Sequence, residues 1–163
     1  MARYDSSSAE ILVFTFKEGL LSAVAHDLKL KATRFTLEVE GDAARLEVEA
    51  ASLRVVTAMK DGVELPSAIA PSKFAEIEKN AFGEVLETKR YPLIQFVTTQ
   101  VTETEVVGKL TLHGQTREVR GRRSGQSAEF RVDQRDFGMK PFSAMLGALK
   151  VKPGLTVKVK WSS

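Results

Sequence analysis

The sequence predicts an all-β protein of antiparallel strands with one amphipathic helix. Apolar and polar residues alternate with a period of two along most of the chain, as in strands with one dry and one wet face. Gly, Pro and polar residues separate these alternating runs, and a single window has helical spacing instead. About eight to ten candidate strands of this kind indicate a closed barrel or a sandwich.

The alternation is clearest in two segments. Residues 35–40 form one alternating run, and the turn residues Gly41–Asp42 lead into a second run at 45–49, so the pair reads as a hairpin. Residues 155–161 alternate equally well after the turn residues Pro153–Gly154. The apolar faces of these runs carry Phe35, Leu37, Val39, Leu46, Val48, Leu155, Val157, Val159 and Trp161.

Weaker alternation predicts the remaining strands. In the first of them, Phe14 and Phe16 share a face, and in the second Val24, His26 and Leu28 do so. The expected strands of this group are residues 10–17, 22–31, 93–101, 105–113, 116–123 and 127–136.

One window has the spacing of a helix. Apolar residues three and four apart predict an amphipathic helix near residues 72–87, with Ser72 as its N-cap. We expect this helix to lie across the barrel or to cover one end. The stretch 57–70 before it is predicted to be a long connection, and connections of that length are often functional.

Composition limits the classes of protein to consider. A chain of 163 residues fits one domain, 1–163. The absence of cysteine excludes disulfides and thiolate metal sites. The sequence contains no signal-peptide pattern and no apolar run of membrane-spanning length, so a cytoplasmic protein without a membrane span is expected. The net charge of +3 is a weak indication of partners.

Few residues could carry catalytic chemistry. His26 is either a satisfied core histidine or a polar contact for a ligand inside the barrel, whereas His113 is expected to point outward or to lie in a turn. Two separated histidines and scattered carboxylates do not form a metal site, and no Gly-x-Ser-x-Gly elbow is present. We therefore expect a protein that is not an enzyme and that uses no metal or organic cofactor.

Two further segments have both a structural and a functional interpretation. Arg117, Arg120, Arg122 and Arg123 form either a solvated edge or an anion patch, and the lack of interleaved aromatic residues argues against nucleic acid. The segment 137–149 is either core packing under a loop or an adaptable portal. Its large apolar residues are Phe137, Met139, Phe142, Met145, Leu146 and Leu149.

Four ordered motifs resemble the YceI-like family. They are Ala25-His26-Asp27, Tyr91-Pro92-x-Ile94-x-Phe96, the segment Leu110–Val119 with its Gly-x-Thr turn, and Arg135-Asp-Phe-Gly-Met139. The resemblance covers roughly the whole chain. It implies a lipocalin-like, up-and-down barrel of eight antiparallel strands, whose long hydrophobic pore binds polyisoprenoids such as a polyprenyl phosphate or a quinone tail.

The expected function is therefore the binding of an elongated apolar ligand, a polyisoprenoid, quinone or other lipid, for storage or transport. A barrel filled by its own side chains, acting as a structural module, and an enzyme that uses His26 on an apolar substrate remain alternatives. A homodimer is compatible with the sequence. Val132 is expected on the inward face of its strand. The expected ligand-contacting residues are Phe14, Phe16, Val24, His26, Leu28, Phe35, Leu37, Val39, Phe96, Phe130, Phe137, Met139, Phe142, Met145 and Leu146.

Overall fold

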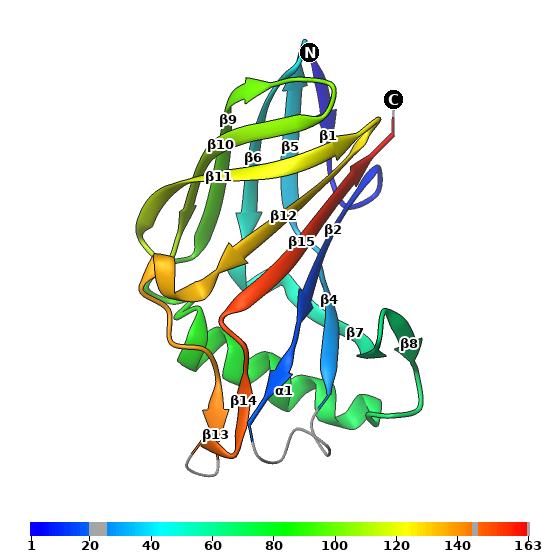
Figure 1. Cartoon of the computed structure of the whole chain (residues 1–163), viewed down its shortest axis with the longest axis vertical. Coiled ribbons are helices and arrows are strands. Elements are labelled where there is room, and N and C mark those ends of the chain that lie inside the picture. The colour runs from blue at the N-terminus through cyan, green and yellow to red at the C-terminus, as the bar shows by residue number, and fades with distance from the viewer. Residues whose placement is uncertain (20–25, 145–146, 163) are drawn as a thin grey trace.

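The computed structural model describes residues 1–19, 26–144 and 147–162. Antiparallel strands dominate these residues, and helix α1 (Phe74–Asn80) lies across the lower end of the sheet (Figure 1). The main sheet curls into a barrel, with both chain termini at the end far from α1 (Figure 1). The all-β, antiparallel class that the alternation predicted is confirmed.

The strands form two sheets in the described part of the chain. The main sheet consists, in spatial order, of β1 (Ala2–Tyr4), β5 (Phe35–Glu40), β6 (Ala43–Glu49), β9 (Leu93–Val101), β10 (Glu105–Leu112), β11 (Gln115–Ser124), β12 (Ser127–Asp133), β15 (Gly154–Trp161), β2 (Ala9–Thr15), β4 (Asp27–Ala32), β7 (Leu53–Lys60) and β8 (Val63–Leu65). The smaller sheet consists of β13 (Ser143–Ala144), β14 (Leu149–Val151) and β3 (Lys17–Glu18).

The barrel closes at a bend in one strand. Strand β4 pairs with β2, and β5 pairs with β6, while only Thr33 and Arg34 separate β4 from β5. Across this bend, the Thr33 amide donates to the Ser52 carbonyl at 3.0 Å, and the Glu49 amide donates to the Arg34 carbonyl at 3.0 Å. A continuous circuit therefore runs from β15 through β2, the β4–β5 strand, β6, β9, β10, β11 and β12 back to β15.

The strand count differs in detail from the expected eight. The main sheet has twelve strands, but eight surround the barrel when the bent pair β4 and β5 is taken as one. The others, β1, β7 and β8, extend the sheet beyond this circuit. The prediction of a long connection at 57–70 is wrong for its first half, because β7 and β8 form a hairpin there around Asp61 and Gly62. Buried Thr57 disturbs the apolar alternation of β7.

The helical window lies where its spacing predicted, but it begins differently. A 3₁₀ turn over Pro71–Lys73 leads into α1, and a π-helical turn over Ala81–Val85 follows. Ser72 is not the N-cap: it lies inside the first turn, and no side chain caps that turn. Pro71 at the first position favours this start, because its fixed φ suits the first turn and its missing N–H would have no partner within the helix there.

Two buried clusters fill the barrel walls. One centres on Phe130, Val132 and Phe137, and the other on Phe35, Leu37 and Val159. Asp133 caps the 3₁₀ turn Gln134–Phe137, because its carboxylate accepts from the Arg135 amide at 2.9 Å. The side-chain and backbone hydrogen bonds from Arg135 lower the pKa of Asp133 below its ordinary value.

Candidate ligand-binding cavity

The barrel encloses a cavity of about 390 Å³. This volume lies within the range of roughly 300–1,000 Å³ that is typical of small-molecule sites. Most of the surface is apolar, as ligand cavities usually are. The lining side chains include Ile11, Val13, Ala32, Leu37, Val39, Leu46, Val48, Leu53, Leu86, Ile94, Phe96, Leu110, Leu112, Val119, Phe130, Val132, Met139, Leu155, Val157, Val159 and Trp161.

Strand register places these side chains at common levels. Leu37 pairs with Leu46, Leu46 with Phe96, and Phe96 with Leu110, so four neighbouring strands point one apolar residue each into the cavity at one height. Directly opposed residues in an antiparallel ladder share a face, which is why the pairs converge. On the other wall, Val157 of β15 pairs with both Phe130 and Val13.

Two glycines make room for the aromatic side chains of the cavity. The Phe96 and Phe130 rings meet edge to face with their centroids 5.4 Å apart. A Cβ at Gly108 would lie 2.5 Å from the Phe96 ring, and a Cβ at Gly121 would lie 2.5 Å from the Phe130 ring. Each ring therefore lies directly over a glycine, and the wall at this height has no space for a larger residue.

Buried side chains cover the end of the cavity near α1. Leu86, after the helical segment, and Met139, after the 3₁₀ turn, are buried and line the cavity there. His113 ties these two segments together. Its Nε2 lies 2.5 Å from Glu87 Oε2, and its Nδ1 lies 3.2 Å from the Phe137 carbonyl oxygen.

Three of the family-like motifs meet at His113. The Tyr91 ring packs against the His113 ring at 4.5 Å between centroids. The His113–Gly114 turn has positive φ at both residues, which is the geometry of a tight hairpin turn. A Cβ at Gly138 would lie 2.5 Å from Nε2 of Gln115, so the Arg135–Met139 motif packs directly on this turn. The motifs therefore build the covered end of the barrel.

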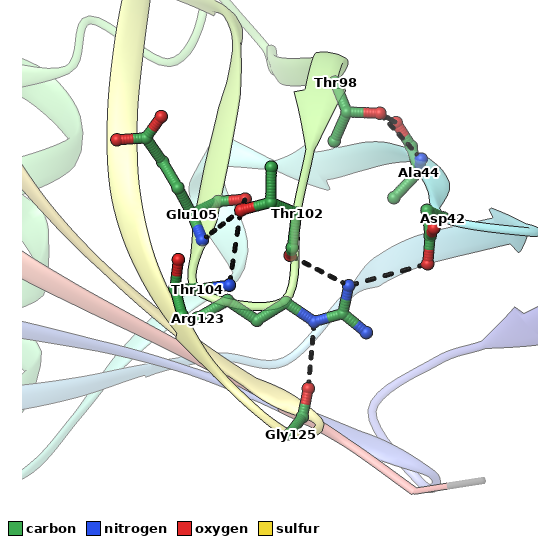
Figure 2. Close-up of polar contacts among 8 residues, drawn as sticks. All are labelled: Asp42, Ala44, Thr98, Thr102, Thr104, Glu105, Arg123 and Gly125. Carbon is green, nitrogen blue, oxygen red and sulfur yellow. Dashed lines mark hydrogen bonds and ion pairs between the residues drawn. The ribbon is translucent and has the colours of Figure 1, made fainter.

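The opposite end of the cavity, where the chain termini lie, is polar. Asp42, Thr98, Arg123 and Gln126 line it. Figure 2 shows Arg123 between the Gly125 and Thr102 carbonyls and the Asp42 carboxylate. Arg123 Nε donates to the Gly125 carbonyl at 3.0 Å, Nη1 donates to the Thr102 carbonyl at 3.4 Å, and Nη1 lies 3.6 Å from Asp42 Oδ1.

The structure brings together part of the set of residues expected from the sequence. The cavity is lined by Leu37, Val39, Phe96, Phe130, Val132 and Met139. Phe35 and Phe137 are buried in the surrounding core without lining the cavity, and Phe142 is half-buried beyond the covered end. Val24, Met145 and Leu146 fall outside the described residues.

The expected face of β2 is wrong. Ile11 and Val13 line the cavity, whereas Phe14 lies on the opposite face under Lys158, whose Nζ is 5.1 Å from the ring centroid. Phe16, beyond the end of β2, is 36% exposed. Ile11 to Phe14 are all apolar, so alternation cannot choose between the two faces. Pairing of Val157 with Val13 in the β15 ladder decides it.

The expected positions of His26 and Leu28 are also wrong. His26 is exposed and precedes β4, which begins at Asp27. The Asp27 carboxylate accepts a hydrogen bond from the Lys17 amide at 2.7 Å. Leu28 is half-buried and does not line the cavity, because it pairs with Thr15 at the end of β2, two residues beyond the lining residue Val13.

Sequence reasoning missed the polar end. Arg123 was one of four clustered arginines, and its alternation placed it with Arg117 on one face without distinguishing the two. The only available signal was its position beside the Gly125–Gln126 turn, where a charged side chain on the inward face can still reach water.

Two further observations concern the described residues. Histidine, cysteine and carboxylate side chains in this part of the chain do not gather in groups of three or more that could hold a metal ion. None of the helices in the same residues has the length and hydropathy needed to cross a bilayer.

Comparisons with known proteins agree with the motifs. A model of the YceI-like domain family matches residues 4–162. Two UPF0312 proteins of Pseudomonas putida, from strains W619 and GB-1, are 35% and 34% identical in an alignment of 103 positions, which covers 51% of this chain and 54% of each relative. The chain thus spans about half the length of the curated relatives it matches.

Two solved structures are similar in outline. A polyisoprenoid binding domain from Saccharophagus degradans gives a TM-score of 0.49 at 9% identity, covering 98% of this chain and 97% of that one. The Campylobacter jejuni YceI protein gives 0.45 at 10% identity, covering 82% and 85%. Neither likeness is strong enough to bear on the ligand of this chain. The family match over residues 4–162 stands on its own, and by it the chain belongs to the YceI-like domain family.

Proposed function

We propose that this protein binds one elongated apolar molecule, a polyisoprenoid, quinone tail or other lipid, inside its barrel for storage or transport. The observation that carries this proposal is the apolar cavity of about 390 Å³. It argues against the alternative of a barrel filled by its own side chains. The choice of a polyisoprenoid comes from the family resemblance, and the mostly apolar lining is compatible with it.

The driving force is sufficient for such a ligand. Each buried methylene contributes about 0.8 kcal/mol, so ten buried carbons contribute roughly 8 kcal/mol. Losses on association are estimated at about 4–15 kcal/mol, and a preformed cavity keeps them toward the lower end. Because most of the lining offers contact area without directed hydrogen bonds, the site selects its ligand by length and shape.

Binding without catalysis is the simpler interpretation. The enzyme alternative depended on His26 within the pocket, and His26 is exposed and absent from the cavity lining. His113 lies at the covered end, where Glu87 and the Phe137 carbonyl already occupy both ring nitrogens. The structure thus provides no histidine that faces the cavity among the described residues.

Mass spectrometry of an organic extract of the purified protein tests the proposal. We expect a long-chain lipid in the wild-type extract and its loss in Leu46→Trp, which fills the middle of the cavity. The matched control is Glu47→Trp, because Glu47 is the next residue of β6 and is exposed. Equal lipid content in the two variants, or no lipid in wild-type protein even after incubation with a polyprenol, would contradict lipid binding in the barrel.

A further inference from the structure

The polar end of the cavity contains one cationic side chain. Among the described residues that line the cavity, Arg123 is the only basic one and Asp42 the only acidic one. The other arginines of its cluster differ from it in exposure and in partners. The side chain of Arg123 is 23% exposed, whereas that of Arg122 is 84% exposed and pairs with Glu129 on the outer surface.

Arg123 is held in place by the chain around it. Its Nε and Nη1 donate to two carbonyls, one from the Gly125 turn and one from Thr102 at the end of β9. Its own amide donates to the Thr104 carbonyl at 2.8 Å. A guanidinium fixed by backbone acceptors loses little further conformational freedom when it binds a ligand.

Not all N–H donors of the Arg123 guanidinium are used in these contacts. It has five N–H groups, and in the described residues no hydrogen bond involves Nη2. Figure 2 shows this nitrogen without a partner among the residues drawn. The side chain of Gln126, which also lines this end, likewise makes no hydrogen bond to the described residues. Several donors are thus available at the polar end of an otherwise apolar cavity.

Asp42 is a replaceable partner for Arg123. Its side chain is 76% exposed in the β5–β6 turn, and the closest approach of 3.6 Å is too long for a hydrogen bond. Exposed ion pairs of this kind contribute little stability. An anion with shorter, charge-assisted contacts to the guanidinium would therefore displace the Asp42 carboxylate easily.

We propose that the cavity selects amphiphiles with one anionic head group, a carboxylate or a phosphate, whose tail lies in the barrel and whose head group binds Arg123 in place of Asp42. This inference rests on the proposed lipid-binding function and specifies the chemistry of its ligand. It also fixes the orientation, because the covered end near Leu86 and Met139 can accept only the apolar tail. A neutral amphiphile would leave the guanidinium donors unmatched.

Fluorescence of Trp161 provides the measurement. It is the single tryptophan of the chain and it lines the cavity, so its emission reports occupancy of the barrel. Farnesyl phosphate is compared with farnesol, and hexadecanoate with hexadecanol, so that each pair shares one tail. We expect the anionic member to bind about tenfold or more tightly, as for a hydrogen bond to a charged group. Its advantage should shrink as salt is raised.

Variants assign the preference to one residue. Arg123→Gln should abolish the preference, and Arg122→Gln, the adjacent exposed control, should retain it. Asp42→Asn should tighten binding of the anionic members only. It lies in an exposed turn, so it tests the inference even if Arg123→Gln folds poorly. Inorganic phosphate alone should leave Trp161 emission unchanged at the same concentrations.

The outcomes separate the two proposals. If no amphiphile of either pair alters Trp161 emission, lipid binding itself fails, and the head-group inference fails with it. If both members of each pair bind equally, or if the preference survives Arg123→Gln, only the head-group inference is overturned. Competition by inorganic phosphate as strong as that by farnesyl phosphate would also overturn it, because Arg123 would then be a site for free anions.

Discussion

Replacing Gly121 with alanine tests whether the aromatic wall of the cavity depends on the glycines beneath it. The added Cβ would lie 2.5 Å from Cδ1 of Phe130 and 2.7 Å from the Glu129 carbonyl oxygen. The ring can rotate only against Phe96, and the carbonyl belongs to the β12 backbone, which is paired on both sides. Overpacking of this kind typically costs about 1–3 kcal/mol, and we expect Gly121→Ala to lie in that range.

The matched control is Gly154→Ala. Gly154 also lies in a strand of the barrel, but a Cβ there meets no atom within 4 Å, and its φ is not in the left-handed region. This variant should be neutral or should gain a few tenths of a kcal/mol, because alanine restricts the unfolded chain. For a chain of this size, a loss of 1 kcal/mol lowers Tm by roughly 2–4 °C.

Urea unfolding of the two variants and wild type provides the comparison. Gly121→Ala should lower the midpoint with an unchanged m-value, which indicates lost stability without a change in the denatured state. It should also weaken lipid binding, because Phe130 lines the cavity. Equal urea midpoints for Gly121→Ala and Gly154→Ala would show that Phe130 and β12 can shift without cost, and the claim that Phe130 needs a glycine at position 121 would be wrong.

Three further predictions concern other parts of the molecule. Leu37→Lys places an unpaired charge on the cavity wall and should destabilise by roughly 3–5 kcal/mol in urea unfolding; a wild-type midpoint would refute its placement. Asp133→Ala removes a cap and should cost up to about 1 kcal/mol near neutral pH. Because the folded pKa of Asp133 is lowered, its contribution is present above the unfolded value of about 3.9 and is lost as pH falls through the folded pKa, so the two proteins should converge in acid unfolding. His26→Leu should leave the binding of amphiphiles, followed by Trp161 fluorescence, unchanged, because His26 does not line the cavity. Weaker binding would show that His26 contacts the ligand.

The sequence predicted best the faces whose alternation was unambiguous. Leu37 and Val39 alternate with Thr and Glu, and both line the cavity as expected. The run Ile11–Phe14 is apolar on both faces, so only its pairing with β15 shows which residues point inward. His26 failed for a different reason: alternation predicted a strand over residues 22–31, but β4 begins at Asp27, so His26 lies just before the strand and not on its inward face.

The polar end of the cavity could not be predicted, because it depends on contacts between distant segments. Asp42 in the β5–β6 turn and Arg123 near the end of β11 meet across the barrel mouth, although about eighty positions separate them in the sequence. In the sequence, Arg123 is one of four nearby arginines and Asp42 is an aspartate in a predicted turn, and nothing in the pattern links the two. The continuity of β4 with β5 through a bend could not be predicted either, because Thr33 and Arg34 look like an ordinary polar break between two separate strands.

The ladder between β2 and β15 has a consequence for the order of folding. It joins residues 9–14 to residues 156–161, so one wall of the barrel depends on the longest-range pairing of the circuit. Sheets built on such distant contacts fold on the scale of milliseconds to seconds, because a large loop must close first. During synthesis, β2 remains without its second neighbour until almost every other strand has left the ribosome. The barrel, and any site inside it, is thus completed by its last strand.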